Sequence, residues 1–229
     1  MPFPFTNASP LYQLFAILAV LVGIALWWRA ARTDHQLLYL YGFGLIGGLL
    51  GAKIAYLLAE GWFYFDHPQR WTIWLTGKSV MGALPGGWIG VEIAKKCLRY
   101  PRITGDRFAI TLPVPLMLGR IGCLQAGCCL GIELPQGRWP AVEAEMAFLA
   151  LMLLFLLLLR AKHRWPTQHF HVFLMAYGLF RFGHEFLRAT PKPFLGLSGY
   201  QLIALTTAGA AACAFHHRHR QIKISPALN

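Results

Sequence analysis

The run LYQLFAILAVLVGIALWW, residues 11–28, decides the fold class of this protein. It contains no charged residue, and about 20 apolar residues are needed to cross a bilayer as a helix. Residues 1–10 before it contain no Lys or Arg, so we do not expect a cleavable signal sequence. We interpret the run as a first spanning helix.

Six further segments are similar in length and mostly apolar. They are residues 38–59, 79–98, 106–123, 141–159, 169–187 and 199–215. Overall 56% of the residues are hydrophobic and only 13% are charged, whereas a soluble domain has about 25% charged residues. We therefore predict an all-α membrane protein with about seven transmembrane helices in a single domain, residues 1–215. Residues 216–229 should be a disordered basic tail.

The charged residues indicate how the helices cross the membrane. The chain has 21 Lys and Arg against 9 Asp and Glu, a net charge of +12. The basic residues lie in alternate connections and at the end of the chain: Arg29 and Arg32; Lys95, Lys96, Arg99, Arg102 and Arg107; Arg160, Lys162 and Arg164; Arg218, Arg220 and Lys223. The positive-inside rule then places the N-terminus outside and the tail in the cytoplasm. The charge is thus a topology signal, and we expect no nucleic-acid partner.

With this topology, the polar residues inside the segments fall in the outer half of the membrane. They are Lys53, Tyr56 and Glu60; Arg120; Glu143 and Glu145; Tyr177, Arg181, Glu185 and Arg188; Tyr200 and Gln201. Burying them in hydrocarbon is costly, so such residues usually line a cavity or pair with one another. We predict a polar cavity whose arginines exceed the available carboxylates and bind an anionic phospholipid headgroup.

Each of these residues also has a structural interpretation. Arg181 and Glu185 are spaced to form an ion pair within one helix. Arg120 could extend from a helix end to the interface. Glu145 lies near a helix N-terminus, where a carboxylate is favourable. Gly86 and Gly87 could simply allow close helix packing.

The five cysteines are Cys97, Cys123, Cys128, Cys129 and Cys213. None of their spacings matches a tetrahedral zinc motif, so we expect no metal and no cofactor. The adjacent Cys128 and Cys129 could form a disulfide, a redox pair or a nucleophile. We favour a role as small buried apolar residues.

Several motifs resemble the bacterial prolipoprotein diacylglyceryl transferase family. Gly119-Arg120-Ile121-Gly122 is similar to the signature of that family, and Leu84-Pro85-Gly86-Gly87 resembles its His-Gly-Gly element. The helix carrying Tyr177-Gly178, Arg181-Phe182 and Glu185-Phe186-Leu187-Arg188 resembles a third family motif. Leu197-Ser198 with Gln201 is similar to the start of the last family helix.

The resemblance implies a multi-pass enzyme of the bacterial inner membrane. It would transfer the diacylglyceryl group of phosphatidylglycerol to a cysteine thiol of a lipobox-containing prolipoprotein and release glycerol phosphate. The implied catalytic residues are Arg120, Arg181 and Glu185. The implied substrate-binding residues are Gly86, Gly87, Glu145, Arg188 and Gln201.

The chain departs from the family pattern at three places. Pro85 stands where the family has histidine, and Lys53 stands where it usually has arginine. Residues 123–129 replace an Asn-rich run with cysteines and small residues. These departures leave two alternatives open: a non-catalytic phospholipid-binding or transport protein, and a membrane thiol oxidoreductase that uses Cys128 and Cys129.

Overall fold

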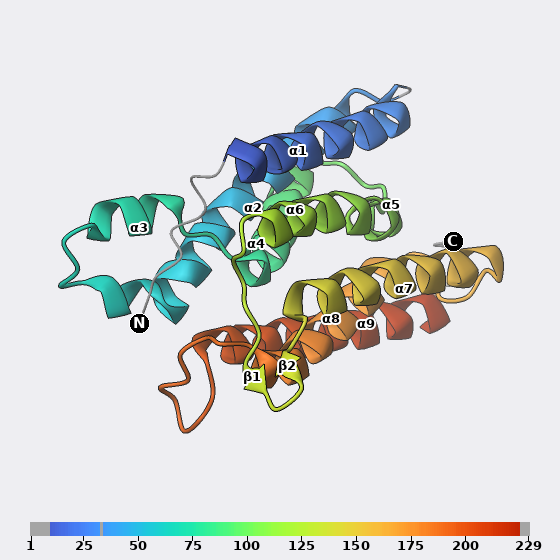
Figure 1. Ribbon diagram of the computed structural model, residues 1–229. Helices are drawn as coiled ribbons and strands as arrows, with labels where there is room; N and C mark the ends of the chain where they lie inside the picture. Colours follow the sequence, from blue (N-terminus) through green and yellow to red (C-terminus); the bar gives the residue numbers. More distant parts are fainter. Residues whose placement is uncertain (1–9, 33, 225–229) are drawn as a thin grey trace.

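The computed structural model describes residues 10–32 and 34–224, and most of them are helical (Figure 1). The α-helices are α1 (Pro10–Ala31), α2 (Gln36–Ala59), α3 (Arg70–Thr76), α4 (Val80–Cys97), α5 (Gly105–Thr111), α6 (Pro113–Gln125), α7 (Ala141–Ala161), α8 (His169–His184) and α9 (Gly199–Ile224). Two 3₁₀ turns, η2 (Gly61–Tyr64) and η3 (Glu185–Leu187), and one hairpin, β1 (Glu133–Leu134) with β2 (Gly137–Arg138), complete the described elements. The signal-sequence prediction concerns residues outside the described part.

Within the described residues, four helical segments are long and apolar enough to cross a membrane. They are Pro10–Arg29, Gln36–Ala59, Gly105–Gln125 and Ala141–Ala161, and at most 28% of each is buried inside the protein. Their outward faces carry large apolar side chains, such as Leu58 and Leu151, each 67% exposed. An all-α membrane protein is therefore confirmed. The count of seven spans stays a prediction, because α8 is short and α4 carries three charged residues near its end.

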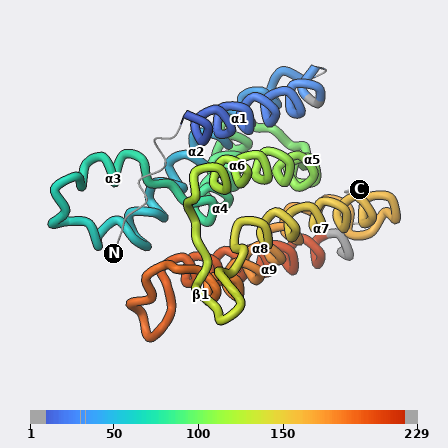
Figure 2. The backbone as a smooth tube through the Cα atoms, viewed as in Figure 1, coloured from blue at the N-terminus to red at the C-terminus, as the bar shows by residue number. Residues whose placement is uncertain are grey.

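The helices form two groups. α1, α2, α4 and α6 form one group, α7, α8 and α9 form the other, and α5 packs mainly on α8 (Figures 1 and 2). α6 packs on α7 and joins the groups, while the chain after α6 runs across to the hairpin (Figure 2). Buried side chains such as Leu149 and Phe173 contribute to the core.

The closest helix contact, between α2 and α4, is made by glycines. A Cβ atom added at Gly86 would meet the carbonyl oxygen of Gly47 and lie 2.8 Å from Gly51 Cα. Gly82 approaches the backbone of Gly51 in the same way. Small residues let helix backbones approach closely in a membrane, where packing replaces the hydrophobic effect as the source of association.

The span Gly105–Gln125 is divided by a proline. Pro113 occupies the first position of α6, where its missing N–H costs no helical hydrogen bond. The segment predicted as one helix over residues 106–123 is consequently two helices, α5 and α6, that meet at Leu112.

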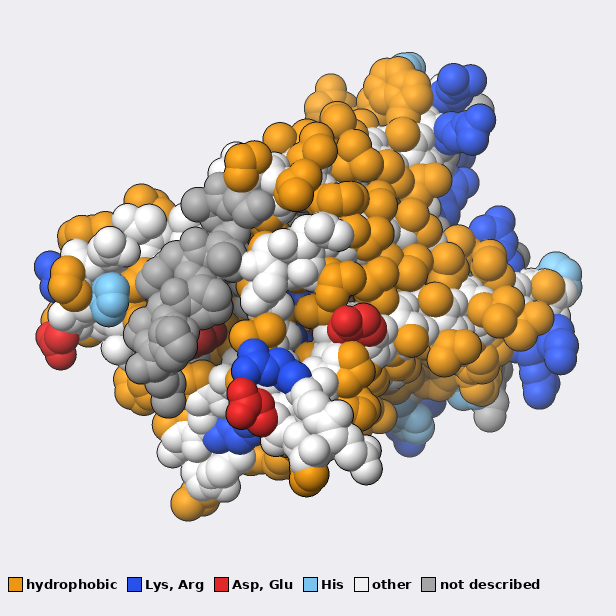
Figure 3. Space-filling view, in the orientation of Figure 1, with side chains coloured by type: hydrophobic (Ala, Val, Ile, Leu, Met, Phe, Trp, Pro, Cys, Tyr) orange, Lys and Arg blue, Asp and Glu red, His pale blue; other side chains and the backbone are white. Residues whose placement is uncertain are grey.

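The expected disorder of the tail is wrong for residues 216–224, which continue α9 as helix. On the face in Figure 3, Lys and Arg side chains gather at the end of the molecule where α1 and α7 end, and hydrophobic side chains cover the helix flanks. This clustering agrees with the alternate-loop pattern in the sequence. The orientation of that end toward the cytoplasm stays a prediction.

Candidate functional site

Glu145, in the first turns of α7, is the centre of a buried polar cluster. Arg120 Nη2 from α6 donates to its Oε1 at 2.7 Å, and Tyr177 OH from α8 donates to the same oxygen at 2.5 Å. Arg181 Nη1, one turn after Tyr177, donates to Oε2 at 3.0 Å. Donors from α6 and α8 therefore meet at one fully buried carboxylate on α7.

Glu185 is a second buried carboxylate beside the first. Arg181 Nη2 donates to its Oε2 at 2.9 Å, so Arg181 bridges Glu185 and Glu145. Thr190 Oγ1 donates to the other oxygen, Oε1. The i,i+4 ion pair suggested by the sequence is thus present, and it belongs to a larger network.

Arg188 lies against this network but is incompletely paired. Its Nε is 3.5 Å from Glu185 Oε2, and its Nη1 is 3.9 Å from Glu145 Oε2. Among the described residues, neither nitrogen has a hydrogen-bond partner, although Arg188 is only 7% exposed. The three guanidiniums of the cluster, from Arg120, Arg181 and Arg188, face two carboxylates. Arg188 thus keeps unpaired donors, and buried donors of this kind are costly without a partner.

The arginines lie at the wall of a large cavity of about 1240 Å³. Arg120, Arg181 and Arg188 line it, whereas the described lining does not include Glu145 or Glu185, which lie behind them. Along α4 the lining runs from Ser79 to Lys95, about 24 Å of helix at 1.5 Å per residue. Apolar residues of α2, α4 and α5, including Leu45, Leu84 and Phe108, form much of the remaining wall.

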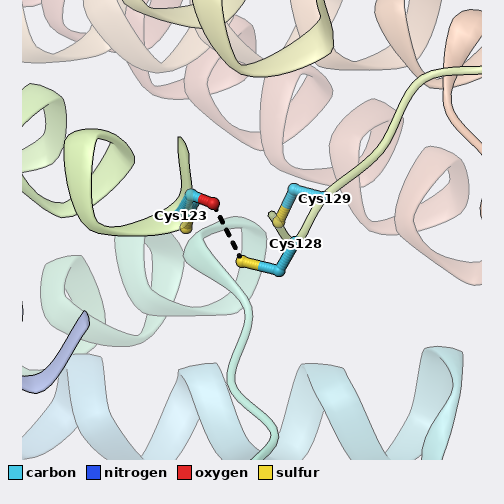
Figure 4. Close-up of side chains that lie close together, drawn as sticks. All are labelled: Cys123, Cys128 and Cys129. Atoms are coloured by element: carbon cyan, nitrogen blue, oxygen red, sulfur yellow. Dashed lines mark hydrogen bonds between the residues drawn. The ribbon is translucent and has the colours of Figure 1, made fainter. Parts of the chain in front are cut away.

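Three cysteines, one in the last turn of α6 and two in the loop after it, also line this cavity. Cys123, Cys128 and Cys129 all contribute to its wall, and their sulfur atoms lie within 4.8 Å of one another (Figure 4). Arg120 Nη1 is 3.5 Å from Cys129 Sγ and 3.9 Å from Cys123 Sγ. Hydrogen bonds from the other two thiols hold the pKa of Cys129 well below its usual range, and Arg188 and Arg120 act in the same direction.

Backbone pairing brings this loop to Arg188. Ile132 N donates to Leu187 O, and Ala189 N donates to Leu130 O, both at 3.0 Å. Residues 130–132 and 187–189 therefore lie side by side, and Gly131 forms an isolated antiparallel β-bridge with Arg188. This pairing holds the loop with Cys128 and Cys129 next to Arg188, on one side of the cavity.

Three residues singled out in the sequence lie away from the arginine cluster. Gly86 packs on α2, although its neighbour Gly87 lines the cavity. Gln201 accepts from Ser198 N and donates to the carbonyl of Phe182, so it joins the ends of α8 and α9. Lys53 Nζ donates to the carbonyls of Trp74, Leu75 and Gly77 at the end of α3.

Sequence reasoning missed two members of the site. Thr190 follows the α8 motif without any signal of its own. Cys123 precedes Cys128 by five residues across Gly127, whose positive φ of 61° turns the chain back. The spacings typical of zinc motifs belong to sets of four ligands, and three cysteines do not reproduce them.

The sequence profile described as "Prolipoprotein diacylglyceryl transferase" matches residues 8–216. Three similar curated proteins are each named phosphatidylglycerol–prolipoprotein diacylglyceryl transferase. That of Clostridium tetani is 30% identical over 197 residues, which cover 78% of this chain and 79% of the relative. That of Acidiphilium cryptum is 29% identical over 225 residues, with 85% and 79% covered. That of Cupriavidus metallidurans is 32% identical over 196 residues, with 76% and 69% covered.

No solved structure matches the chain. The profile nevertheless covers nearly all of the described residues, from α1 to the middle of α9. It includes the arginine cluster and the cysteine loop. The chain belongs to the prolipoprotein diacylglyceryl transferase family.

Proposed function

We propose that this protein transfers the diacylglyceryl group of phosphatidylglycerol to a cysteine thiol of a prolipoprotein or a related acceptor. It would act as a multi-pass protein of the bacterial inner membrane, with the arginine cluster toward the outer leaflet. The names of its relatives supply the reaction. The observation that carries the proposal is the set of three arginines, with unpaired donors on Arg188, at the wall of a large, mostly apolar cavity.

The shape and charge of the cavity suit a phospholipid. Its volume of about 1240 Å³ exceeds the roughly 300–1,000 Å³ typical of small-molecule pockets. The apolar wall along α4 would hold acyl chains, and the guanidiniums of Arg120, Arg181 and Arg188 would hold the phosphate. Guanidinium groups match phosphate oxygens in geometry and charge.

The chemistry requires a displacement at carbon. The acceptor sulfur forms a bond to the glycerol carbon that bears the phosphate, and the carbon–oxygen bond breaks. The glycerol phosphate that leaves gains negative charge as this bond breaks. Arg120 and Arg188 would stabilise that charge, since fixed donors aimed at developing charge lower the barrier. Glu145 and Glu185 would hold the guanidiniums in position.

One observation favours a second candidate, a phospholipid-binding or transport protein without catalysis. Pro85 occupies the place of the family histidine, so the element that resembles the His-Gly-Gly motif has no general base. Glu145 and Glu185 are already engaged by arginines. In this alternative the cavity binds lipid and the reaction is absent.

One experiment tests both candidates. The protein is purified in lipid nanodiscs with labelled phosphatidylglycerol and incubated with a peptide containing a lipobox cysteine. A matched peptide has serine in place of that cysteine. With the label in the acylated glycerol, we expect it on the cysteine peptide only. Mild alkali should release the acyl chains and leave the label on the peptide, because the carbon–sulfur bond is stable to this treatment.

The outcomes separate the two functions. Labelling of the cysteine peptide supports the transferase. Phosphatidylglycerol that stays bound through native mass spectrometry, without any peptide labelling, supports the binding protein. A protein that neither labels the peptide nor retains phosphatidylglycerol contradicts both.

A further inference from the structure

We propose that Cys123, Cys128 and Cys129 form a zinc site with three protein ligands and one open coordination position toward the cavity. Figure 4 shows Cys128 and Cys129 facing the end of α6, where Cys123 lies. The three sulfur atoms are within 4.8 Å of one another. The proposal goes beyond the transferase reaction, because nothing in that reaction requires a metal.

The geometry is close to what zinc requires. At a Zn–S distance of about 2.3 Å, tetrahedral coordination places sulfurs about 3.8 Å apart. The cluster needs to contract by at most about 1 Å, which side-chain rotation supplies. Three protein ligands plus one exchangeable ligand is the arrangement of catalytic zinc sites, whereas structural sites have four protein ligands.

The loop that carries the sulfurs is held in place by its backbone. Cys128 N donates to Cys123 O at 3.1 Å, and Cys128 Sγ donates to the same oxygen at 3.5 Å. Coordination by the Cys128 sulfur would replace this long sulfur contact and the contacts between the thiols, and would leave the backbone bond intact. The site is thus largely assembled before a metal arrives.

The surrounding charges favour a thiolate-bound metal. Three thiolates and one Zn²⁺ carry a net charge of −1, which suits the positive surroundings of Arg120 and Arg188. Arg120 Nη1 already points at Cys129 Sγ and Cys123 Sγ, at 3.5 and 3.9 Å. Donors to ligand atoms orient the ligands and tune the metal. Soft sulfur ligands select zinc over magnesium or calcium.

The open position would receive the acceptor, and this step depends on the proposed function. All three cysteines line the cavity that also holds the arginines. The acceptor thiol would bind zinc as a thiolate and release its proton to solvent, because a coordinating thiol is deprotonated. Its sulfur would then attack the glycerol carbon while glycerol phosphate leaves. Zinc would thereby replace the base that is absent at Pro85.

The metal site is tested without any activity assay. The protein is purified without chelators, and its zinc is measured by plasma mass spectrometry. We expect about one zinc per chain, and less than a tenth of that in the Cys129→Ser and Cys123→Ser variants. Cys97→Ser and Cys213→Ser are matched controls, because both cysteines are exposed and outside the cluster. Co²⁺ in place of zinc should give sulfur-to-metal charge-transfer absorption in the wild type and the two control variants, and not in the Cys129→Ser and Cys123→Ser variants.

Loss of zinc from a variant could also result from misfolding, so a second measurement uses the wild-type protein alone. Zinc should protect the three cluster thiols from alkylation, and a chelator should expose them, as seen by peptide mass spectrometry. Wild-type protein without zinc or cobalt absorption, copper in place of zinc, or a disulfide among the three cysteines would overturn the proposal.

The acceptor role has its own readout. The absorption of the Co²⁺ protein should shift when the cysteine peptide is added and should not change with the serine peptide. A metal site whose spectrum ignores the cysteine peptide refutes acceptor binding by the metal. A shift without lipid transfer refutes the transferase function and leaves the metal site standing.

Discussion

Two sets of helix contacts in this protein differ in the side chains that form them. α2 and α4 meet through Gly47, Gly51, Gly82 and Gly86, with backbone against backbone. α6, α7 and α8 meet through Arg120, Glu145 and Arg181, all of them buried. Glycine contacts are a low-cost way to associate helices in lipid, whereas buried ion pairs are costly to assemble.

The difference separates stability from function. A contact that only holds helices together needs no charge, as the α2–α4 contact demonstrates. Buried ion pairs are weak evidence for stability, and ionisable groups within membrane proteins usually mark functional sites. We therefore expect glycine substitutions to damage folding first and substitution of Arg188, which lies at the edge of the network, to damage function first.

The largest effect should follow Glu145→Gln. The change leaves Arg120 without its carboxylate partner and Arg181 with Glu185 alone, and breaking a buried ion pair costs about 3–5 kcal/mol. We expect a low yield of folded protein and a clearly lower unfolding temperature in detergent. Glu143→Gln is the control, because Glu143 is exposed two residues earlier on the same helix. Equal stability of the two variants would mean that Glu145 does not organise the cluster.

The next effect should follow Arg188→Ala, and it should fall on activity. Removing one donor from a developing negative charge typically lowers rates by about 10²–10³-fold. Because two nitrogens of Arg188 lack hydrogen-bond partners among the described residues, we expect the unfolding temperature to stay within a few degrees of wild type. Phosphatidylglycerol-dependent labelling of the cysteine peptide measures the loss. Arg102→Ala, at an exposed ion pair with Asp34, should keep full activity.

A smaller effect on stability should follow Gly86→Ala. The added methyl group would meet the backbone of Gly47 and Gly51, which cannot move like a side chain. Overpacking of this kind costs about 1–3 kcal/mol. Gly42→Ala on α2 is the control, since an added Cβ there meets nothing within 4 Å. Thermal unfolding in detergent compares them, and a Gly86→Ala protein as stable as the Gly42→Ala protein would show that the contact adapts.

The sequence was sufficient to predict the membrane class and the arginine cluster. Both predictions rest on the spacing of apolar and polar residues and on the energetic cost of burying charged side chains in hydrocarbon. Uninterrupted apolar runs indicate spans, and the stripe through Tyr177, Arg181 and Glu185 places these side chains on one helix face. Glu145 was harder to assign, because a carboxylate near a helix N-terminus is also favourable at the surface. Only packing of α7 against α6 and α8 distinguishes it from the exposed Glu143.

Other features depend on contacts that spacing does not encode. Gly86 and Gly87 are adjacent, yet one packs on α2 and the other also lines the cavity. The approach of Cys123 to Cys129 depends on the turn at Gly127 and on backbone pairing between residues 130–132 and 187–189. Such pairings between distant loops have no local periodicity, so they become visible only in three dimensions.

The smallest effect should follow Lys53→Met, and it concerns a departure from the family pattern. Lys53 Nζ donates to carbonyls of Trp74, Leu75 and Gly77, which belong to the last turn of α3 and the residue after it. Methionine keeps the apolar stem and removes these hydrogen bonds, which are at most partly buried and hold only the short α3. We expect faster hydrogen exchange confined to α3 and the loop after it, with lipid transfer unchanged. A loss of transfer comparable to that of Arg188→Ala would instead connect α3 to the site, since Gly77 and Lys78 also line the cavity.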